Sequence, residues 1–453
     1  MKVPLDAELG EIWSRLRITS EANTPLDMQW FGFAMDGEVM DRTINIKQGS
    51  TEPVYLQGDT LVIRGSAMDD VVSITRDAGK IVVVYNGNEK SFTTTSNVIR
   101  EVKVDGYQGK DTVTYTDNVK EVHDVLMSPY NATITSGSLK VVISNVSNIS
   151  YVGNSLDVAD MRDSEGDDTV VLGKNTGTME GPGRDFVNKV DKVYQIQVSS
   201  IHGGNDKLTL NGTDSADQFM SWLNTVSMSD VGVVKPDGKV EHDYFNQAFG
   251  FTDVTVNAVA DPNKKALDVA TIFEKTPGST NLKADPETAR VVRSNTKPEE
   301  ALNLTLNMFN TINVTAEKES TKLSASLTGS AGVDALVASD TQVNLTGKRP
   351  TDSMTYSIQV NHFANCVVDG GAGKDTVSYV SGKGGEHLTV MNDQKTVELF
   401  SSFNAMDEAL LKMIAFESLK FDAAKNKSTV DLTSINKALI DIDLIGDWIE
   451  RNR

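Results

Sequence analysis

Several features that would place a sequence in a familiar class are absent from this one. The chain has a single cysteine, Cys366, so no disulfide can form within it. Its five histidines include no pair at a metal-binding spacing such as H-E-x-x-H, and G-x-S-x-G, G-x-x-x-x-G-K-[ST] and C-x-x-C are all missing. No stretch reaches the roughly 18 apolar residues of a membrane-spanning helix. We therefore predict no membrane insertion, and no residue stands out as catalytic.

Basic residues are in short supply compared with acidic ones. The chain carries 43 basic and 63 acidic residues, a formal net charge of -20. Such a charge repels phosphate backbones, so nucleic acid is not an expected partner, whereas metal cations and basic or neutral surfaces are. Hydrophobic residues make up 39% of the chain, enough for a continuous core.

What the sequence does contain is a repeat. A short alternating apolar strand, a turn rich in Gly, Asp, Asn or Lys, and a second short strand recur about every fifty residues. IREVKVDGYQGKDTVTY, from Ile99, and FANCVVDGGAGKDTVSY, from Phe363, are two clear copies. Equivalent positions along the chain are Val104, Val152, Val198, Val256, Val314, Val368 and Phe421.

The repeat predicts an all-β fold. Alternation such as Val102, Val104 and then Val113, Tyr115 is typical of half-buried strands. One such unit cannot bury its apolar face alone, and stacked units build a continuous core, so we predict a right-handed parallel β-helix, or β-solenoid. Tandem β-sandwich domains are the alternative. A fifty-residue unit could form two coils, or one coil with a long excursion.

The two ends of the chain differ from the repeats. Residues 53–433 carry the repeats, and we expect 1–52 and 434–453 to cover the open ends of the solenoid. Apolar residues at helical spacing predict a short helix in each end segment and a third over 406–414. These apolar residues are Leu9, Ile12, Trp13 and Leu16 after Asp6, and Ile435, Leu439, Ile442, Ile445 and Ile449 after Ser434.

One turn matches a calcium-binding consensus. The segment GGAGKDTVS, from Gly370, fits G-G-x-G-x-D-x-U-x at every specified position. It resembles the calcium-binding repeat of the repeats-in-toxin (hemolysin-type) family, found in bacterial extracellular proteins with parallel β-helices. This resemblance implies calcium ligands at Gly370, Gly371, Gly373 and Asp375.

Weaker copies of the same motif place Asp111 and Asp168 among the candidate metal ligands. The family stacks its nonapeptides directly, whereas here the copies stand about fifty residues apart. A plain tight turn, in which Gly and Asp are also common, is the alternative reading. The acidic run from Asp157 to Asp168 does not fit the helix-loop-helix calcium loop, and we expect a solvated acidic loop or a nonstandard cation site there.

The resemblance to bacterial surface proteins implies a function. It suggests a structural or adhesive module of a cell-surface or secreted protein, stabilised by calcium, with copies of itself or surface and matrix components as partners. The alternative is a protein that binds or degrades polysaccharide, as β-helix lyases and epimerases do. An extracellular or cell-surface location follows from the same resemblance. The first twenty residues lack the apolar stretch of a signal peptide, so we interpret the chain as a mature or trimmed form.

Overall fold

A computed structural model describes the chain as two compact units, Met1–Tyr55 and Leu56–Arg453. In the first unit, β1 (Gly10–Ile18) pairs antiparallel with β2 (Glu38–Ile46). The predicted N-terminal helix is therefore wrong, because Ile12, Trp13 and Leu16 lie on a strand, while Asp6 and Leu9 fall outside the described residues. The described residues are 10–18, 38–46, 52–94, 98–236, 239–259, 267–275, 278–294, 301–317, 321–381, 385–391, 395–401, 409–423, 427–431 and 441–450.

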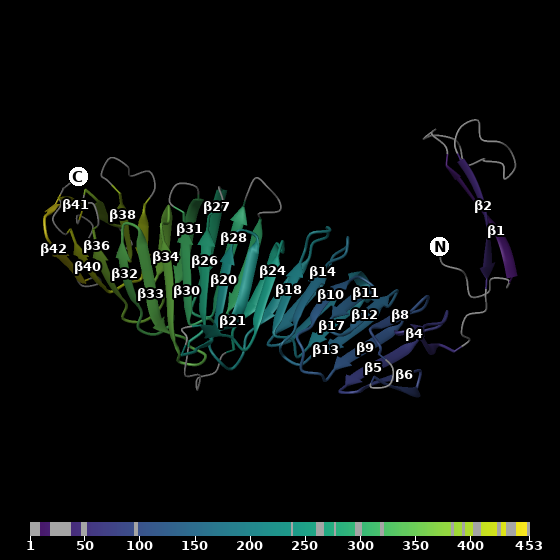
Figure 1. Ribbon diagram of the computed structural model, residues 1–453. Coiled ribbons are helices and arrows are strands. Elements are labelled where there is room, and N and C mark those ends of the chain that lie inside the picture. Colours follow the sequence, from purple (N-terminus) through teal and green to yellow (C-terminus); the bar gives the residue numbers. More distant parts are fainter. Residues whose placement is uncertain are drawn as a thin grey trace. The chain divides into compact units, whose positions relative to one another are not determined.

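The second unit is an elongated stack of two long sheets (Figure 1). The chain crosses from one sheet to the other, and most neighbouring strands pair in parallel, as in a β-solenoid. In the described residues, sheet 1 has 19 strands and sheet 2 has 20. Within that same part of the chain, no helix is long and apolar enough to cross a membrane.

Sheet 1 runs from the N-terminal to the C-terminal end of the stack through three-stranded antiparallel insertions. In spatial order its strands are β3 (Val54–Gln57), β4 (Thr60–Arg64), β8 (Glu101–Asp105), β12 (Lys140–Ser144), β11 (Asn131–Thr135), β10 (Asp124–Ser128), β14 (Val158–Arg162), β18 (Gln195–Ser199), β24 (Phe245–Phe249), β21 (Thr225–Asp230), β20 (Asp217–Trp222), β26 (Val269–Glu274), β30 (Thr311–Ala316), β34 (Thr355–Asn361), β33 (Gln342–Lys348), β32 (Ala335–Ser339), β36 (Thr376–Val380), β40 (Ser418–Asp422) and β42 (Asp441–Ile445).

Sheet 2 is built in the same way. In spatial order its strands are β7 (Asn88–Thr93), β6 (Lys80–Tyr85), β5 (Val71–Asp77), β9 (Thr112–Asp117), β13 (Asn148–Val152), β17 (Val187–Asp191), β16 (Thr176–Glu180), β15 (Thr169–Gly173), β19 (Lys207–Asn211), β25 (Asp253–Asn257), β29 (Leu302–Asn307), β28 (Thr288–Ser294), β27 (Gly278–Ala284), β31 (Thr321–Thr328), β35 (Asn365–Asp369), β39 (Leu411–Ile414), β38 (Thr396–Phe400), β37 (His387–Val390), β41 (Ser428–Asp431) and β43 (Trp448–Glu450). Outside both sheets lie a hairpin, β22 (Val233–Val234) with β23 (Val240–Glu241), and the 3₁₀ turn Pro182–Arg184.

The fifty-residue repeat corresponds to five strands. Each repeat unit begins with one strand in one sheet, followed by one strand in the other sheet. It ends with a meander in the first of these sheets, that is, three consecutive strands that run forward, back and forward. In the unit that begins at β8, the first strand and the meander β10–β12 lie in sheet 1, and β9 lies in sheet 2. In the unit that begins at β13, sheet 2 holds the meander. Successive units thus exchange the two sheets.

The sequence positions that define the repeat confirm this exchange. Val104, Val198 and Val314 lie in sheet 1, whereas Val152 and Val256 lie in sheet 2. Each sheet is continuous across all units, so the tandem β-sandwich alternative is wrong.

The core lies between the two sheets. Alternate residues of each strand point inward and stack on equivalent residues of the next strand, as Ile63, Val104 and Ile143 do in sheet 1. All three side chains are buried, and burial of an aliphatic side chain of this size contributes about 1.5–3 kcal/mol. The stacked ladder therefore supplies both the apolar core and the backbone hydrogen bonds.

The C-terminal end continues the sheets. Ile442 and Ile445 lie on β42, and Ile449 lies on β43, so the predicted C-terminal helix is wrong over these residues. Ser434, Ile435 and Leu439 fall outside the described residues. The helix predicted over 406–414 is also wrong where the chain is described, because β39 occupies Leu411–Ile414.

Candidate functional site

The corners between the two sheets are lined by buried carboxylates. An aspartate stands just before, or at the first residue of, many of the strands that follow a corner. Burial of so many carboxylates is unusual unless each is paired or hydrogen-bonded. These corner aspartates, all no more than 2% exposed, are Asp70, Asp111, Asp157, Asp168, Asp206, Asp217, Asp268, Asp334 and Asp375.

Asp375, from the turn that matches the calcium consensus, lies at the corner between β35 and β36. Its Oδ1 accepts the backbone N–H of Asp334 in the neighbouring coil at 2.7 Å. Its own N–H donates to Glu417 Oε2 in the next coil, also at 2.7 Å. Asp375 thus connects three successive coils of the solenoid.

The glycines of this turn allow the coils to approach closely. A Cβ on Gly373 would lie 2.0 Å from the carbonyl oxygen of Gly332, and one on Gly371 would lie 2.5 Å from that of Ser330. Gly371 also has a φ of +87°, which favours glycine. A Cβ on Gly370 would come within 2.9 Å of Asp375 Oδ2. These glycines make room for the adjacent turn and for the carboxylate.

Asp334 has a different role from Asp375. It precedes the first strand of a meander, and its carboxylate holds its own turn together by accepting the N–H of Ser330 at 2.6 Å and the hydroxyl of Tyr356 at 2.7 Å. We call such residues leading aspartates; they are Asp70, Asp168, Asp217 and Asp334. The trailing aspartates, each of which accepts the N–H of a leading one, are Asp111, Asp206, Asp268 and Asp375.

The leading aspartates have a sequence signature that the glycine-aspartate motif does not contain. Each follows a serine or threonine by four residues, and the N–H of that residue donates to the carboxylate. Tyrosine hydroxyls supply a further hydrogen bond to Asp217 and Asp334, from Tyr244 and Tyr356 respectively. The pattern [ST]-x-x-x-D before a strand is therefore the readable sign of this corner.

Asp168 departs from this pattern. Phe186 occupies the position that Tyr244 and Tyr356 occupy in their own meanders. In each case this is the residue immediately before the third strand of the meander begins to pair with its parallel neighbour. Asp168 keeps the bonds from Ser164, but its Oδ1 is buried without a hydrogen-bond partner among the described residues. The missing phenolic hydroxyl accounts for this free oxygen.

Burial raises the pKa of several corner carboxyls. Desolvation is the largest cause, and neighbouring carboxylates add to it; together they raise the pKa of Asp375 to about 6. The pKa of Asp111, Asp168 and Asp206 is raised for the same reasons. In Asp70 burial acts in the same direction, but hydrogen bonds from Ser66, Tyr85 and Asn86 outweigh it and lower the pKa.

The three predicted metal-ligand aspartates lie at separate corners. Asp111 and Asp168 lie at corners where the chain passes from sheet 1 to sheet 2. Asp375 lies at a corner where the chain passes from sheet 2 to sheet 1. Asp375 Oδ2 is buried and accepts no hydrogen bond from the described residues, so this oxygen is available to a cation or a proton. In the described part of the chain, no three or more His, Cys, Asp or Glu side chains are grouped to hold a metal ion. Calcium at these turns remains a prediction.

The acidic run between Asp157 and Asp168 is only partly the solvated loop that we expected, because Glu165 and Asp167 are exposed but three of its aspartates are not. Asp157, Asp163 and Asp168 are buried. Asp163 accepts the N–H of Ile201 and that of His202, both at 2.8 Å. These side chains are corner residues that join adjacent coils.

One corner replaces the leading aspartate with a histidine. The N–H of His123 donates to Asp157 Oδ1, as a leading residue does, and its ring lies between two carboxylates. Nδ1 is 2.9 Å from Asp157 Oδ1, and Nε2 is 3.1 Å from Asp117 Oδ2. Burial alone would lower the histidine pKa, but the two carboxylates outweigh it and raise that pKa to about 9. His123 is therefore an imidazolium at neutral pH.

Arg76 joins this histidine corner from the neighbouring coil. Its guanidinium lies 3.1 Å from Asp117 Oδ2 and 3.3 Å from Glu121 Oε2. It also donates to the hydroxyls of Ser136 and Ser138, at 3.4 and 2.9 Å. One half-buried arginine thus holds the turn between β11 and β12 against the histidine corner.

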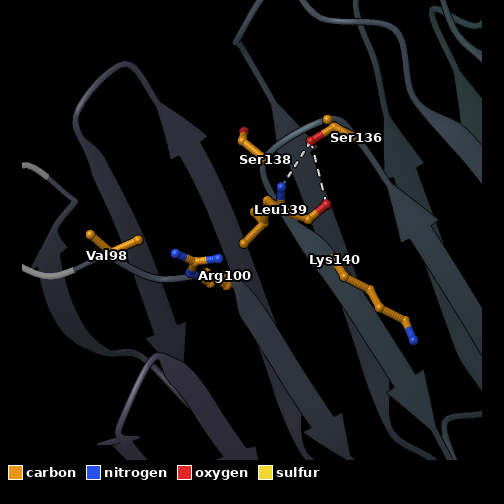
Figure 2. A pocket seen from close by; sticks show the side chains of 7 residues that line it. Val98, Arg100, Ser136, Ser138, Leu139 and Lys140 are labelled. Atoms are coloured by element: carbon orange, nitrogen blue, oxygen red, sulfur yellow. Dashed lines mark hydrogen bonds between the residues drawn. The ribbon is translucent and has the colours of Figure 1, made fainter.

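A surface pocket of about 450 Å³ lies beside that turn (Figure 2). Leu139 occupies the position held by Tyr244 and Tyr356 in other meanders. Figure 2 shows the Arg100 guanidinium directed toward Leu139, whereas Lys140 extends away from it. The lining residues are Val98, Arg100, Ser136, Gly137, Ser138, Leu139 and Lys140.

A second pocket, of about 260 Å³, shares Val98, Ser138 and Leu139 with the first and reaches Arg76. Neither pocket was predicted from the sequence. The basic residues that line the two pockets, Arg76, Arg100 and Lys140, are 24 or more positions apart in the chain, and only the stacking of coils brings them together.

Comparisons with known proteins give no relative: no protein-family model matches the chain, and no curated protein is significantly similar to it.

Proposed function

We propose that this chain is a structural or adhesive module of a bacterial cell-surface or secreted protein, with other copies of itself or surface and matrix components as partners. The observation that carries the proposal is the continuity of the two sheets through every repeat, with four leading aspartates bonded to the next coil by buried hydrogen bonds. A stack of 19 strands at about 4.8 Å each gives a rod on the order of 90 Å long. A rod of this kind suits a protein that spaces or presents other groups.

The location is tested in the bacterium that produces the protein. Intact cells are treated with a protease, and the chain is followed with an antibody beside a cytosolic marker. We expect digestion of the chain, or its presence in the medium, while the marker stays intact. Protection equal to that of the marker in intact cells, followed by digestion after lysis, would contradict the proposal.

Adhesion is tested with the full chain on beads. Coated beads should aggregate or bind the producing cells, whereas beads coated with an unrelated acidic protein should not. Dispersed beads that bind no cells would contradict an adhesive role and leave a spacer role, which surface exposure on intact cells would support.

Calcium is proposed as a stabilising ion at the Gly370 to Asp375 turn. The free Oδ2 of Asp375 supports the proposal, because calcium prefers carboxylate oxygens, and the charges of Asp369 and Glu417 add to the negative potential there. Thermal unfolding in millimolar calcium and in excess chelator tests it. A midpoint several degrees higher with calcium, lost in Asp375→Asn, is expected; equal midpoints would show that the turn is a plain corner.

A further inference from the structure

We propose that the pocket beside the histidine corner binds a single carboxylate-bearing sugar at the end of a glycan, with Arg100 as its carboxylate ligand. The inference does not depend on whether the module is structural or adhesive. The proposed site lies on the N-terminal coils, where β8 and β12 pair.

Arg100 is available to a ligand. Its side chain is 73% exposed, and its only ion pair among the described residues is a long one, 3.9 Å from Nε to Asp59 Oδ2. No described residue accepts a hydrogen bond from its terminal amino groups. A guanidinium binds a carboxylate through two parallel hydrogen bonds, which gives Arg100 a defined specificity.

The rest of the pocket suits a sugar ring. Val98 and Leu139 offer an aliphatic surface for the C–H face of a ring, and the Ser136–Gly137–Ser138 turn presents polar groups beside it (Figure 2). At about 450 Å³ the pocket lies within the usual range of small-ligand sites, roughly 300–1,000 Å³. Lys140 belongs to the lining, but its side chain extends away from Leu139 (Figure 2), so its positive charge acts on the ligand from a distance.

The turn that forms the pocket is held in place before any ligand arrives. Arg76 donates to Ser136 and Ser138 while it is paired with Asp117, and Ser136 Oγ also accepts the N–H of Leu139 at 3.2 Å. A site whose backbone is already fixed loses less entropy on binding.

The charge of the whole molecule limits the ligand to one acidic residue. Arg100 and Lys140 are local cations on a chain of net charge -20, so a polyanion would be repelled as it extended beyond the pocket. A terminal acidic sugar puts its carboxylate at the cations and its remaining length in solvent.

The test uses the full chain and two matched ligands, methyl glucuronide and methyl glucoside, followed by ligand-observed NMR titration. We expect saturable binding of the glucuronide and none of the glucoside. Arg100→Gln should weaken binding by about tenfold, the usual loss for a charge-assisted pair, and Lys140→Gln by about twofold to threefold. Lys103→Gln on β8 is the control: Lys103 is paired with Glu101 at 2.9 Å, and its loss should leave binding unchanged.

Three outcomes would overturn the proposal. They are equal binding of the two ligands, unchanged binding in a folded Arg100→Gln, and competition by inorganic phosphate as strong as by glucuronide, which would mean a simple anion site. Circular dichroism checks that each variant is folded. The protease and bead experiments do not depend on Arg100, so failure of ligand binding and failure of the proposed function are separate results.

Discussion

Two kinds of corner in the same solenoid stabilise their buried carboxylates in different ways. At the standard corner, a leading aspartate, Asp334, is satisfied by neutral donors, the Ser330 N–H and the Tyr356 hydroxyl. At the histidine corner, Asp117 and Asp157 also accept tyrosine hydroxyls, but two cations, Arg76 and His123, pair with them as well. The backbone link between coils is thus retained while the charge of the corner changes.

The change in charge has a structural consequence. At the standard corner a buried tyrosine lies beside the aspartate and donates its hydroxyl to it. At the histidine corner the equivalent residue is Leu139, and a pocket lies next to it. The departure from the repeat therefore coincides with the surface that we assign to a ligand.

The largest expected effect is at the histidine corner. Asp157→Ala removes one of the two carboxylates beside the imidazolium and leaves the Tyr151 hydroxyl without its acceptor. Loss of one partner of a buried ion pair costs about 3–5 kcal/mol. Urea unfolding should show this loss, whereas the control Asp160→Ala, on the outward face of β14, should cost less than 1 kcal/mol. Equal effects would mean that the buried pair adds no stability.

The histidine corner should also lose stability in alkali. The pKa of His123 is raised to about 9 from 6.5, so its contribution is complete below pH 6.5 and is lost as the pH rises through 9. The free energy of unfolding is measured by urea between pH 6 and 10. The difference in the free energy of unfolding between wild type and His123→Gln should fall by a few kcal/mol over this pH range. A flat difference would mean that His123 is neutral in the fold.

The standard corner should respond in the acid range instead. The pKa of Asp375 is raised from 3.8 to about 6, so its contribution is complete below pH 3.8 and is lost as the pH rises through 6. Asp375→Asn cannot ionise, and the difference between wild type and this variant should change between pH 4 and 6 in chelator. A difference that changes only above pH 7 would contradict the comparison of the two corners.

Removal of one neutral donor should have a smaller effect. Tyr356→Phe deletes the hydroxyl that donates to Asp334 and should cost about 1–2 kcal/mol in urea unfolding. Tyr107→Phe, at an exposed tyrosine, is the matched control and should change stability by less than 0.5 kcal/mol. No loss at Tyr356 would show that the remaining bonds from Ser330 are sufficient.

The smallest effect should be a gain. Phe186→Tyr places a hydroxyl where Tyr356 has one, next to the free Oδ1 of Asp168, and should stabilise the fold by about 0.5–1.5 kcal/mol. The added hydrogen bond should also lower the pKa of Asp168, measured by carboxyl NMR. A loss of stability would mean that the corner is packed too tightly around the ring.

The repeat and the strand pattern were readable from the sequence because each strand alternates apolar and polar residues. Membership of one sheet or the other was not readable, because Val104 and Val256 have the same local pattern although they lie in different sheets. The terminal helices were mispredicted for a related reason. Ile442, Ile445 and Ile449 have helical spacing, but their neighbours extend the sheets as β42 and β43.

The candidate site was only partly readable. Glycine and aspartate in a turn look the same whether they bind a cation or close a corner, and the coil-to-coil contacts of Asp375 are invisible in one repeat. The pocket depended on Arg100, Ser136 and Leu139, which are neighbours only because β12 pairs with β8. Such contacts follow from the stacking register, which no local pattern specifies.

The exchange of sheets between successive units amounts to a half-turn screw along the rod. Loss or gain of a single fifty-residue unit would therefore rotate everything downstream to the opposite side, whereas a change of two units would only alter the length. A chain that grew by duplication in pairs would keep all its binding groups facing one way. One that grew by single units would present them on both flanks.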